Sequence, residues 1–129
     1  MALNLYQRAF GGQIVDVQYY RDLPEDSGLV VSEEDKDLIL FSRLIWPDGR
    51  ELLCADIIGP VERGNNMYVS VQTESTSEVN KAWLNLREGG KIHMDLMTSF
   101  FATLHGSLQD KFGINWMFTV PKEPFREYP

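Results

Sequence analysis

The feature that most constrains this chain is a pair of glycines that occurs twice in the same local setting. Gly11-Gly12 and Gly89-Gly90 each follow a stretch with helical spacing and lead directly into a stretch with strand character. Glycine ends a helix readily because it adopts left-handed backbone without a steric penalty. The stretches around the glycines repeat as well, so the sequence predicts one structural module used twice.

The first half of the chain predicts one helix followed by three strands. The expected elements are a helix over residues 1–10, a strand over 13–21, a polar loop over 22–36, and strands over 38–46 and 51–57. The helix has apolar positions on one face, and the first strand alternates between apolar and polar side chains. Pro47-Asp48-Gly49-Arg50 is a turn sequence typical of a hairpin between the last two strands.

The second half predicts the same order with one additional strand in front. The expected elements are a linker over residues 59–66, a strand over 67–73, a helix that begins at Ser75 or Thr76 and runs through Leu86, and strands over 91–96, 102–109 and 114–120. Apolar residues spaced three and four apart support the helix. The sequence therefore predicts one α+β domain made of a first module (1–58, αβββ), a second module (66–120, βαβββ) and a tail (121–129).

Four short sequences carry a resemblance to a known family. They are residues 5–12, 88–92, 98–101 and 106–117. They resemble the PhnB-like branch of the vicinal-oxygen-chelate superfamily, which includes glyoxalase I and bleomycin-resistance proteins. The resemblance implies two paired βαβββ modules that form a curled mixed sheet, with modules paired within or between chains, so a homodimer is expected.

The predicted first module departs from this family because it begins with the helix and lacks the leading strand. The missing strand leaves a sheet edge with unpaired backbone groups, which proteins usually cover. We expect a partner chain or the C-terminal tail to cover this edge, unless the natural chain has a further N-terminal strand.

The resemblance also points to four positions where metal-dependent relatives bind a divalent ion through His, Glu or Gln. The first position falls on the absent strand, and the others fall near Leu52 or Leu53, at Asn66 or Met67, and at Met117. None of these residues is His, Asp or Glu, although zinc and nickel prefer imidazole and carboxylate ligands. The two histidines, His93 and His105, lie on different predicted strands. We therefore expect no metal ion, no other cofactor and no metal-dependent catalysis.

His105 is the candidate catalytic residue of the chain. By strand alternation it lies on the same side as Thr103 and Ser107, where it can face a cavity and act as a general base or bind a ligand. Asp56 is a candidate to orient its ring. The alternatives are that the imidazole faces solvent or is hydrogen-bonded for structural reasons, and that Asp56 only begins a turn.

A small group of residues forms the candidate ligand-binding wall. Its members are Cys54, Tyr68, Phe101, His105, Trp116 and Met117. Aromatic and thioether side chains suit a flat organic ligand, and the same residue types also fill an ordinary sheet core. The thiol of Cys54 is expected to be a buried structural group rather than a nucleophile.

Charge and cysteine content exclude several classes of partner. Twelve Lys and Arg against nineteen Asp and Glu give a net charge of −7, and no basic patch indicates nucleic-acid or anionic-membrane binding. A single cysteine allows no internal disulfide and suits a reducing compartment, so a cytoplasmic location is expected. The favoured function is a metal-free protein that binds an unidentified small organic molecule. The alternatives are a metal- or base-assisted enzyme of the glyoxalase type (lyase, isomerase or dioxygenase) and a non-catalytic interaction module.

Overall fold

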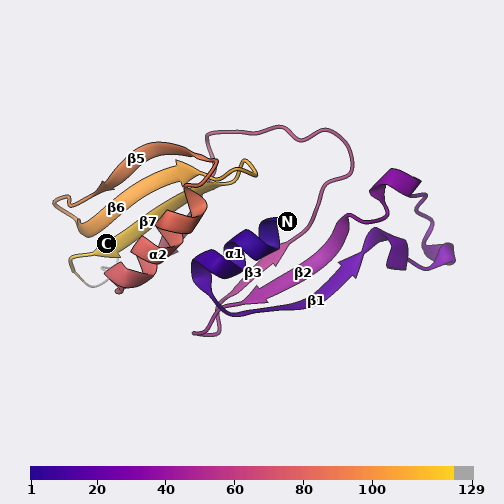
Figure 1. Ribbon diagram of the computed structural model, residues 1–129, viewed down its shortest axis with the longest axis horizontal. Coiled ribbons are helices and arrows are strands. Elements are labelled where there is room, and N and C mark those ends of the chain that lie inside the picture. The colour runs from indigo at the N-terminus through magenta and orange to yellow at the C-terminus, as the bar shows by residue number, and fades with distance from the viewer. Residues whose placement is uncertain (124–129) are drawn as a thin grey trace, which may run out of the picture. The chain divides into compact units, whose positions relative to one another are not determined.

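A computed structural model describes residues 1–123 of the chain. The fold is α+β, as expected, and it divides into two compact units (Figure 1). The first unit contains residues 3–7 and 11–62, and the second contains the chain from Arg63 onward together with Arg8–Phe10. Neither α-helix within residues 1–123 is long and apolar enough to cross a membrane.

The first unit contains a three-stranded antiparallel sheet and the central part of one helix. The helix is α1 (Ala2–Phe10), of which Leu3–Gln7 belong to this unit and Ala2 and Arg8–Phe10 to the second. The strands are β1 (Gln13–Tyr19), β2 (Ile39–Ile45) and β3 (Glu51–Cys54), with three short 3-10 turns between β1 and β2. The strand order is β1-β2-β3. Within the described residues no strand lies on the outer edge of β3 in this sheet, so the first module has the predicted αβββ order.

The second unit has the complete βαβββ order. Its elements are β4 (Val69–Gln72), α2 (Thr76–Leu86), β5 (Lys91–Met97), β6 (Ala102–Gln109) and β7 (Asn115–Pro121). The strand order is β4-β7-β6-β5, in which β4 runs parallel to β7 and the other pairs are antiparallel. The Ser75 hydroxyl accepts a hydrogen bond from the Glu78 N–H at 3.1 Å, which confirms the predicted helix cap.

The glycine pairs that predicted the duplication occupy equivalent places in the two units. A Cβ atom at Gly12 would lie 1.9 Å from the Ile45 carbonyl oxygen, and a Cβ at Gly90 would lie 2.2 Å from that of Gln109. Each glycine therefore lets the strand after the helix pass close to the end of its neighbouring strand. The close backbone approach explains the second glycine of each pair better than helix termination alone does.

The hairpin turns between the last two strands of each unit are also equivalent. The Trp46 N–H donates to the Arg50 carbonyl at 2.8 Å, and the Asp110 N–H donates to the Ile114 carbonyl at the same distance. This correspondence aligns β3 with β7 residue by residue. Leu53, near the second expected metal position, therefore corresponds to Met117 at the fourth.

Several strands differ from their predicted bounds. β1 ends at Tyr19 because a 3-10 turn begins at Tyr20, and its pairing register with β2 shifts between Val15 and Gln18. The expected alternation of exposure holds from Val15 to Tyr19. Asp16 lies in this irregular segment with a positive φ of 52°, which is uncommon outside glycine. β3 ends at Cys54 rather than at residue 57. The C-terminal part of the predicted tail, residues 124–129, lies outside the described residues.

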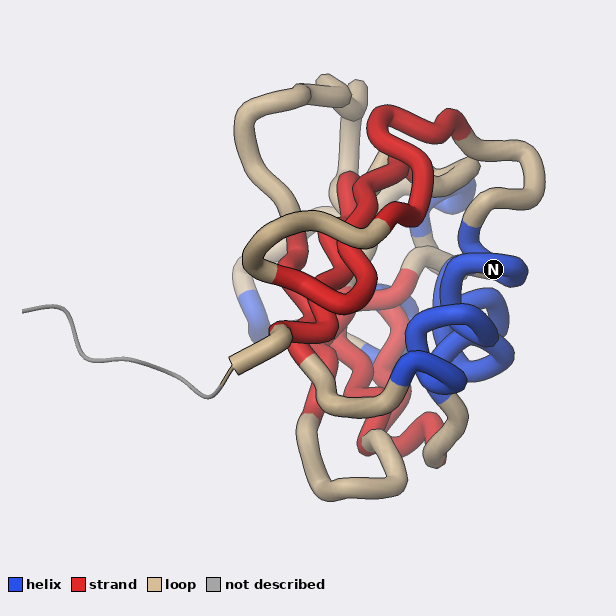
Figure 2. Tube along the Cα trace, turned by 90° about the vertical axis from the view of Figure 1, so that its left-hand side faces the viewer, coloured by secondary structure: helices blue, strands red, loops and turns tan. Residues whose placement is uncertain are grey.

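In the second unit α2 covers one face of the sheet, and α2 leaves the other face uncovered (Figures 1 and 2). In the second unit the buried positions of α2 are Val79, Ala82, Trp83 and Leu86. The Trp83 ring contacts that of Phe118 with 6.2 Å between centroids, so the Phe118 side of β7 faces the helix. Because strand side chains alternate, Met117 and Thr119 project to the opposite face.

Candidate functional site

The face of the second sheet opposite α2 is the candidate site, and we call it the open face. Three residue pairs on the two central strands, β6 and β7, form its floor. They are His105 with Thr119, Ser107 with Met117, and Gln109 with Asn115. All six side chains share one face because they alternate with the helix-facing side chains of the same strands.

His105 is held on this face by two neighbours. Its Nδ1 lies 2.9 Å from the hydroxyl oxygen of Thr119, and its ring meets the edge of Phe101 with 5.0 Å between centroids. The side chain is half-buried. Since a hydroxyl can donate or accept, Thr119 is compatible with either neutral tautomer of the imidazole.

His93 belongs to a hydrogen-bond network centred on Asn115. The His93 Nε2 atom lies 3.2 Å from Asn115 Oδ1, and Gln109 donates from its side-chain amide to the same oxygen at 3.3 Å. The sequence indicated His93 only as an isolated strand residue. No local pattern links positions 93 and 115, and only the pairing of β5, β6 and β7 brings them together.

Tyr68 and Met117 complete the set of predicted residues at the open face. Tyr68 immediately precedes β4, and its ring meets the ring of His93 edge to face with 5.9 Å between centroids. Met117 lies at the middle of the floor and is half-buried. The structure thus places Tyr68, Phe101, His105 and Met117 on or beside one face of one sheet.

Trp116 lies on the other side of β7. Its side chain is 1% exposed, and its ring contacts those of Phe10 and Phe118. The indole N–H donates to the Asp110 carboxylate at 2.9 Å. We therefore assign Trp116 to the core rather than to the ligand-binding wall.

Cys54 lies at the end of β3 in the first unit. Burial, and secondarily the negative charge of Asp56, raise the pKa of the Cys54 thiol, so the reactive thiolate is disfavoured. Cys54 is half-buried rather than buried as expected, and the raised pKa agrees with the expectation that its thiol is not a nucleophile. The sequence offered Asp56 as a residue that could orient the His105 ring. In the structure its carboxylate instead accepts a hydrogen bond from the Ile39 N–H at 2.7 Å.

The side chains of the described residues do not fit the metal site of the metal-dependent relatives. Within residues 1–123, no group of three or more His, Cys, Asp and Glu side chains is placed to hold a metal ion. The equivalent positions Leu53 and Met117 provide an aliphatic group and a thioether. Zinc and nickel require imidazole, thiolate or carboxylate ligands that converge on one point.

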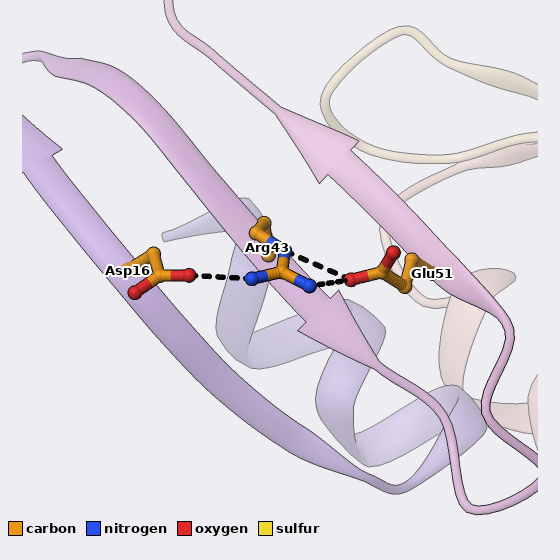
Figure 3. Close-up of polar contacts among 3 residues, drawn as sticks. All are labelled: Asp16, Arg43 and Glu51. Atoms are coloured by element: carbon orange, nitrogen blue, oxygen red, sulfur yellow. Dashed lines mark hydrogen bonds and ion pairs between the residues drawn. The ribbon is translucent and has the colours of Figure 1, made fainter.

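A charged cluster that the sequence pattern did not indicate joins the three strands of the first sheet (Figure 3). Arg43 on β2 donates from Nη1 to the Asp16 carboxylate at 2.6 Å and from Nε to the Glu51 carboxylate at 2.8 Å. The hydrogen bond with Asp16, followed by that with Glu51, holds the pKa of Arg43 above its ordinary value. Arg43 therefore stays charged, and its two carboxylate partners already satisfy it, so we assign this cluster no ligand.

Comparison with known proteins places this geometry in a family. The family model of the Glyoxalase/Bleomycin resistance protein/Dioxygenase superfamily matches residues 1–118. The chain belongs to this superfamily. Among curated proteins, this superfamily member is similar to Protein YjdN of Escherichia coli (strain K12), with 25% identity over 95% of the chain and 87% of YjdN.

Two solved structures share the fold of this superfamily member. Protein PA1353 from Pseudomonas aeruginosa is 28% identical, with a TM-score of 0.77 over 92% of the chain and 85% of PA1353. A Bacillus cereus PhnB protein, named for a 3-demethylubiquinone-9 3-methyltransferase activity, is 24% identical, with a TM-score of 0.68 over 92% of the chain and 87% of that structure. The superfamily membership expected from the sequence is confirmed by the family model, and the two structures share its fold. The PhnB-like branch stays a prediction.

Proposed function

We propose that this superfamily member binds a small organic molecule on the open face of the second sheet without using a metal ion. The observation that carries the proposal is the environment of the two histidines. His105 pairs with the Thr119 hydroxyl and His93 with the Asn115 amide, so both imidazoles are engaged by neutral groups. This arrangement suits hydrogen bonding to an organic ligand rather than shared coordination of a cation.

The chemistry of the open face sets the kind of ligand that it binds. Met117 and Phe101 provide apolar contact, and His105 offers its Nε2 atom as one directional hydrogen-bonding group. Ligand sites commonly combine an apolar lining with a few polar groups that fix orientation. A largely apolar molecule with a polar substituent therefore fits this part of the face best.

The methyltransferase activity in the name of the Bacillus cereus protein is not part of this proposal. A nucleotide-type methyl donor calls for a glycine-rich turn between a strand and a helix, where backbone N–H groups bind anionic oxygens. Both glycine pairs of this chain lie instead between a helix and a strand. A homodimer and a cytoplasmic location remain predictions, and light scattering of the purified protein tests the first.

The metal-free part of the proposal is tested by elemental analysis. The protein is purified without added metal, and the analysis is repeated after soaking with zinc, nickel and manganese and then desalting. We expect less than stoichiometric metal in every sample. Stoichiometric retention of any one ion would refute the metal-free proposal and favour a metal-dependent lyase, isomerase or dioxygenase.

The location of the ligand is tested by a matched pair of variants. A fragment library is screened by NMR against the wild type, Met117→Glu and Leu84→Glu. Leu84 is 57% exposed on α2, so its substitution makes the same chemical change away from the open face. Hits should lose binding in M117E and retain it in L84E, whereas equal binding to both variants would place the ligand elsewhere.

A further inference from the structure

Asn115 has a side-chain orientation that its surroundings determine. The residue is 6% exposed, and its Nδ2 atom lies 2.8 Å from the Gly64 carbonyl oxygen and 3.2 Å from the Met67 carbonyl oxygen. A backbone carbonyl can only accept, so the group facing both carbonyls must be the amide NH₂. The reversed amide would place an acceptor oxygen against two other acceptors in a buried site, which is costly.

This orientation in turn determines the protonation of His93. With the NH₂ group committed to the two carbonyls, Asn115 Oδ1 faces the Nε2 atoms of Gln109 and His93. The oxygen can only accept, so the His93 Nε2 atom must carry a proton. In the neutral imidazole the lone pair is then on Nδ1, which becomes a hydrogen-bond acceptor.

We propose that Asn115 fixes His93 as the Nε2–H tautomer and that His93 Nδ1 accepts a hydrogen bond from a hydroxyl group of the ligand. This inference rests on the proposed function and names a second polar contact on the same face. The His93 side chain is exposed, and the ring of Tyr68 meets it edge to face. An uncharged molecule with a hydroxyl group on a flat apolar ring suits both residues. Its hydroxyl donates to His93 Nδ1, and its ring contacts the ring of Tyr68.

The His93 contact is separate from that of His105. Gln109 and His105 lie four positions apart on β6, which corresponds to about 13 Å along an extended strand. His93 lies with Gln109 and Asn115 at one end of this span, and Met117 lies between the two ends. His93 and His105 therefore offer two separate hydrogen-bonding positions on the open face.

The tautomer is tested directly by two-bond ¹H–¹⁵N NMR of the imidazoles, at a pH where both are neutral. In the wild type, His93 should show a protonated Nε2 and an unprotonated Nδ1 with no detectable second tautomer. Asn115→Leu should produce a mixture of tautomers, because it removes the acceptor oxygen that faces His93 Nε2. The backbone spectrum of the variant reports whether it is folded. A tautomer mixture, or the Nδ1–H form, in the wild type would overturn the inference.

The ligand contact is tested with phenol and its methyl ether, anisole, which has the same ring but no hydroxyl proton. Phenol should shift the His93 and Tyr68 signals and bind the wild type roughly three- to tenfold more tightly than it binds His93→Phe, the range expected from one hydrogen bond. Anisole should bind both proteins equally. Equal phenol affinity for the wild type and H93F overturns this inference and leaves the proposed function intact. Failure of phenol, anisole and every library fragment to bind the open face, in a protein with the expected tautomer, overturns the proposed function and the ligand contact together.

Discussion

Replacing Asp110 by alanine should strongly destabilise the second unit. Asp110 is 1% exposed and begins the turn between β6 and β7. Its Oδ1 atom accepts from the backbone N–H groups of Phe112 at 2.8 Å and Ile114 at 3.1 Å, and its Oδ2 atom accepts from the Trp116 indole. One carboxylate therefore shapes the turn and satisfies the polar atom of a core aromatic residue.

The size of the stability loss depends on whether the N–H groups of Phe112, Ile114 and the Trp116 indole can bind water once the carboxylate is removed. A hydrogen bond to a charged group contributes about 1.5–3 kcal/mol, and a buried donor that loses its partner costs about as much. Ile114 is 41% exposed, so a backbone N–H at this turn can be rehydrated, but the indole of the 1% exposed Trp116 cannot. We expect D110A to lower the free energy of unfolding by about 3–5 kcal/mol in total, and the melting temperature by roughly 10–20 °C.

Urea unfolding followed by far-UV circular dichroism measures this effect. Asp110→Asn is the matched variant, because its Oδ1 can still accept both backbone bonds while its NH₂ group faces the indole N–H of Trp116. D110N should therefore lose about 1.5–3 kcal/mol in the wild type and clearly less in a Trp116→Phe background, as a double-mutant cycle would show. A loss below about 1 kcal/mol in D110A, or additivity of D110N and W116F, would refute this reasoning.

Three further predictions follow from the same structure. Gly90→Ala should cost about 1–3 kcal/mol in the urea titration, since its Cβ would lie 2.2 Å from a β6 carbonyl oxygen; unchanged stability would contradict that approach. Cys54 should react with iodoacetamide at neutral pH more slowly than an unfolded control peptide, because burial and then Asp56 raise the pKa of the thiol, and Asp56→Asn should speed the reaction. The backbone hydrogen bond from Arg50 lowers the pKa of Asp48 below its ordinary value of 3.8. The contribution of Asp48 to stability is therefore present above pH 3.8, is lost as the pH falls through the lower folded value, and should be absent in Asp48→Asn when pH-dependent unfolding is compared.

Features that depend on neighbours along the chain were predictable from the sequence. The helix cap at Ser75, the spacing of apolar residues in α2 and the glycine that follows α1 all involve residues within about one or two turns of each other. Their geometry is fixed by local sterics and by hydrogen bonds of short sequence separation. Because the two halves repeat these local signals, the duplicated βαβββ architecture also follows from the order of residues alone.

The candidate site could be predicted only in part. Strand alternation placed His105 on the same side of its strand as Ser107, and the pairing of β6 with β7 adds Met117 to that face. The same reasoning did not separate Trp116 from the ligand-binding wall. Alternation tells which residues share a face, but the side that the helix covers depends on packing between elements that are distant in the sequence.

Tertiary structure alone decided the contacts that give the site its chemistry. The pairing of His93 with Asn115 spans 22 positions, and the linkage of Asp16, Arg43 and Glu51 requires three strands to be in register. The irregular backbone at Asp16 coincides with a shift in the pairing of β1 with β2. The sequence by itself determined the elements, their order and the expected superfamily, since these follow from local preferences and short motifs. Strand register and the side covered by each helix determined the site, because both depend on the packing of the whole sheet.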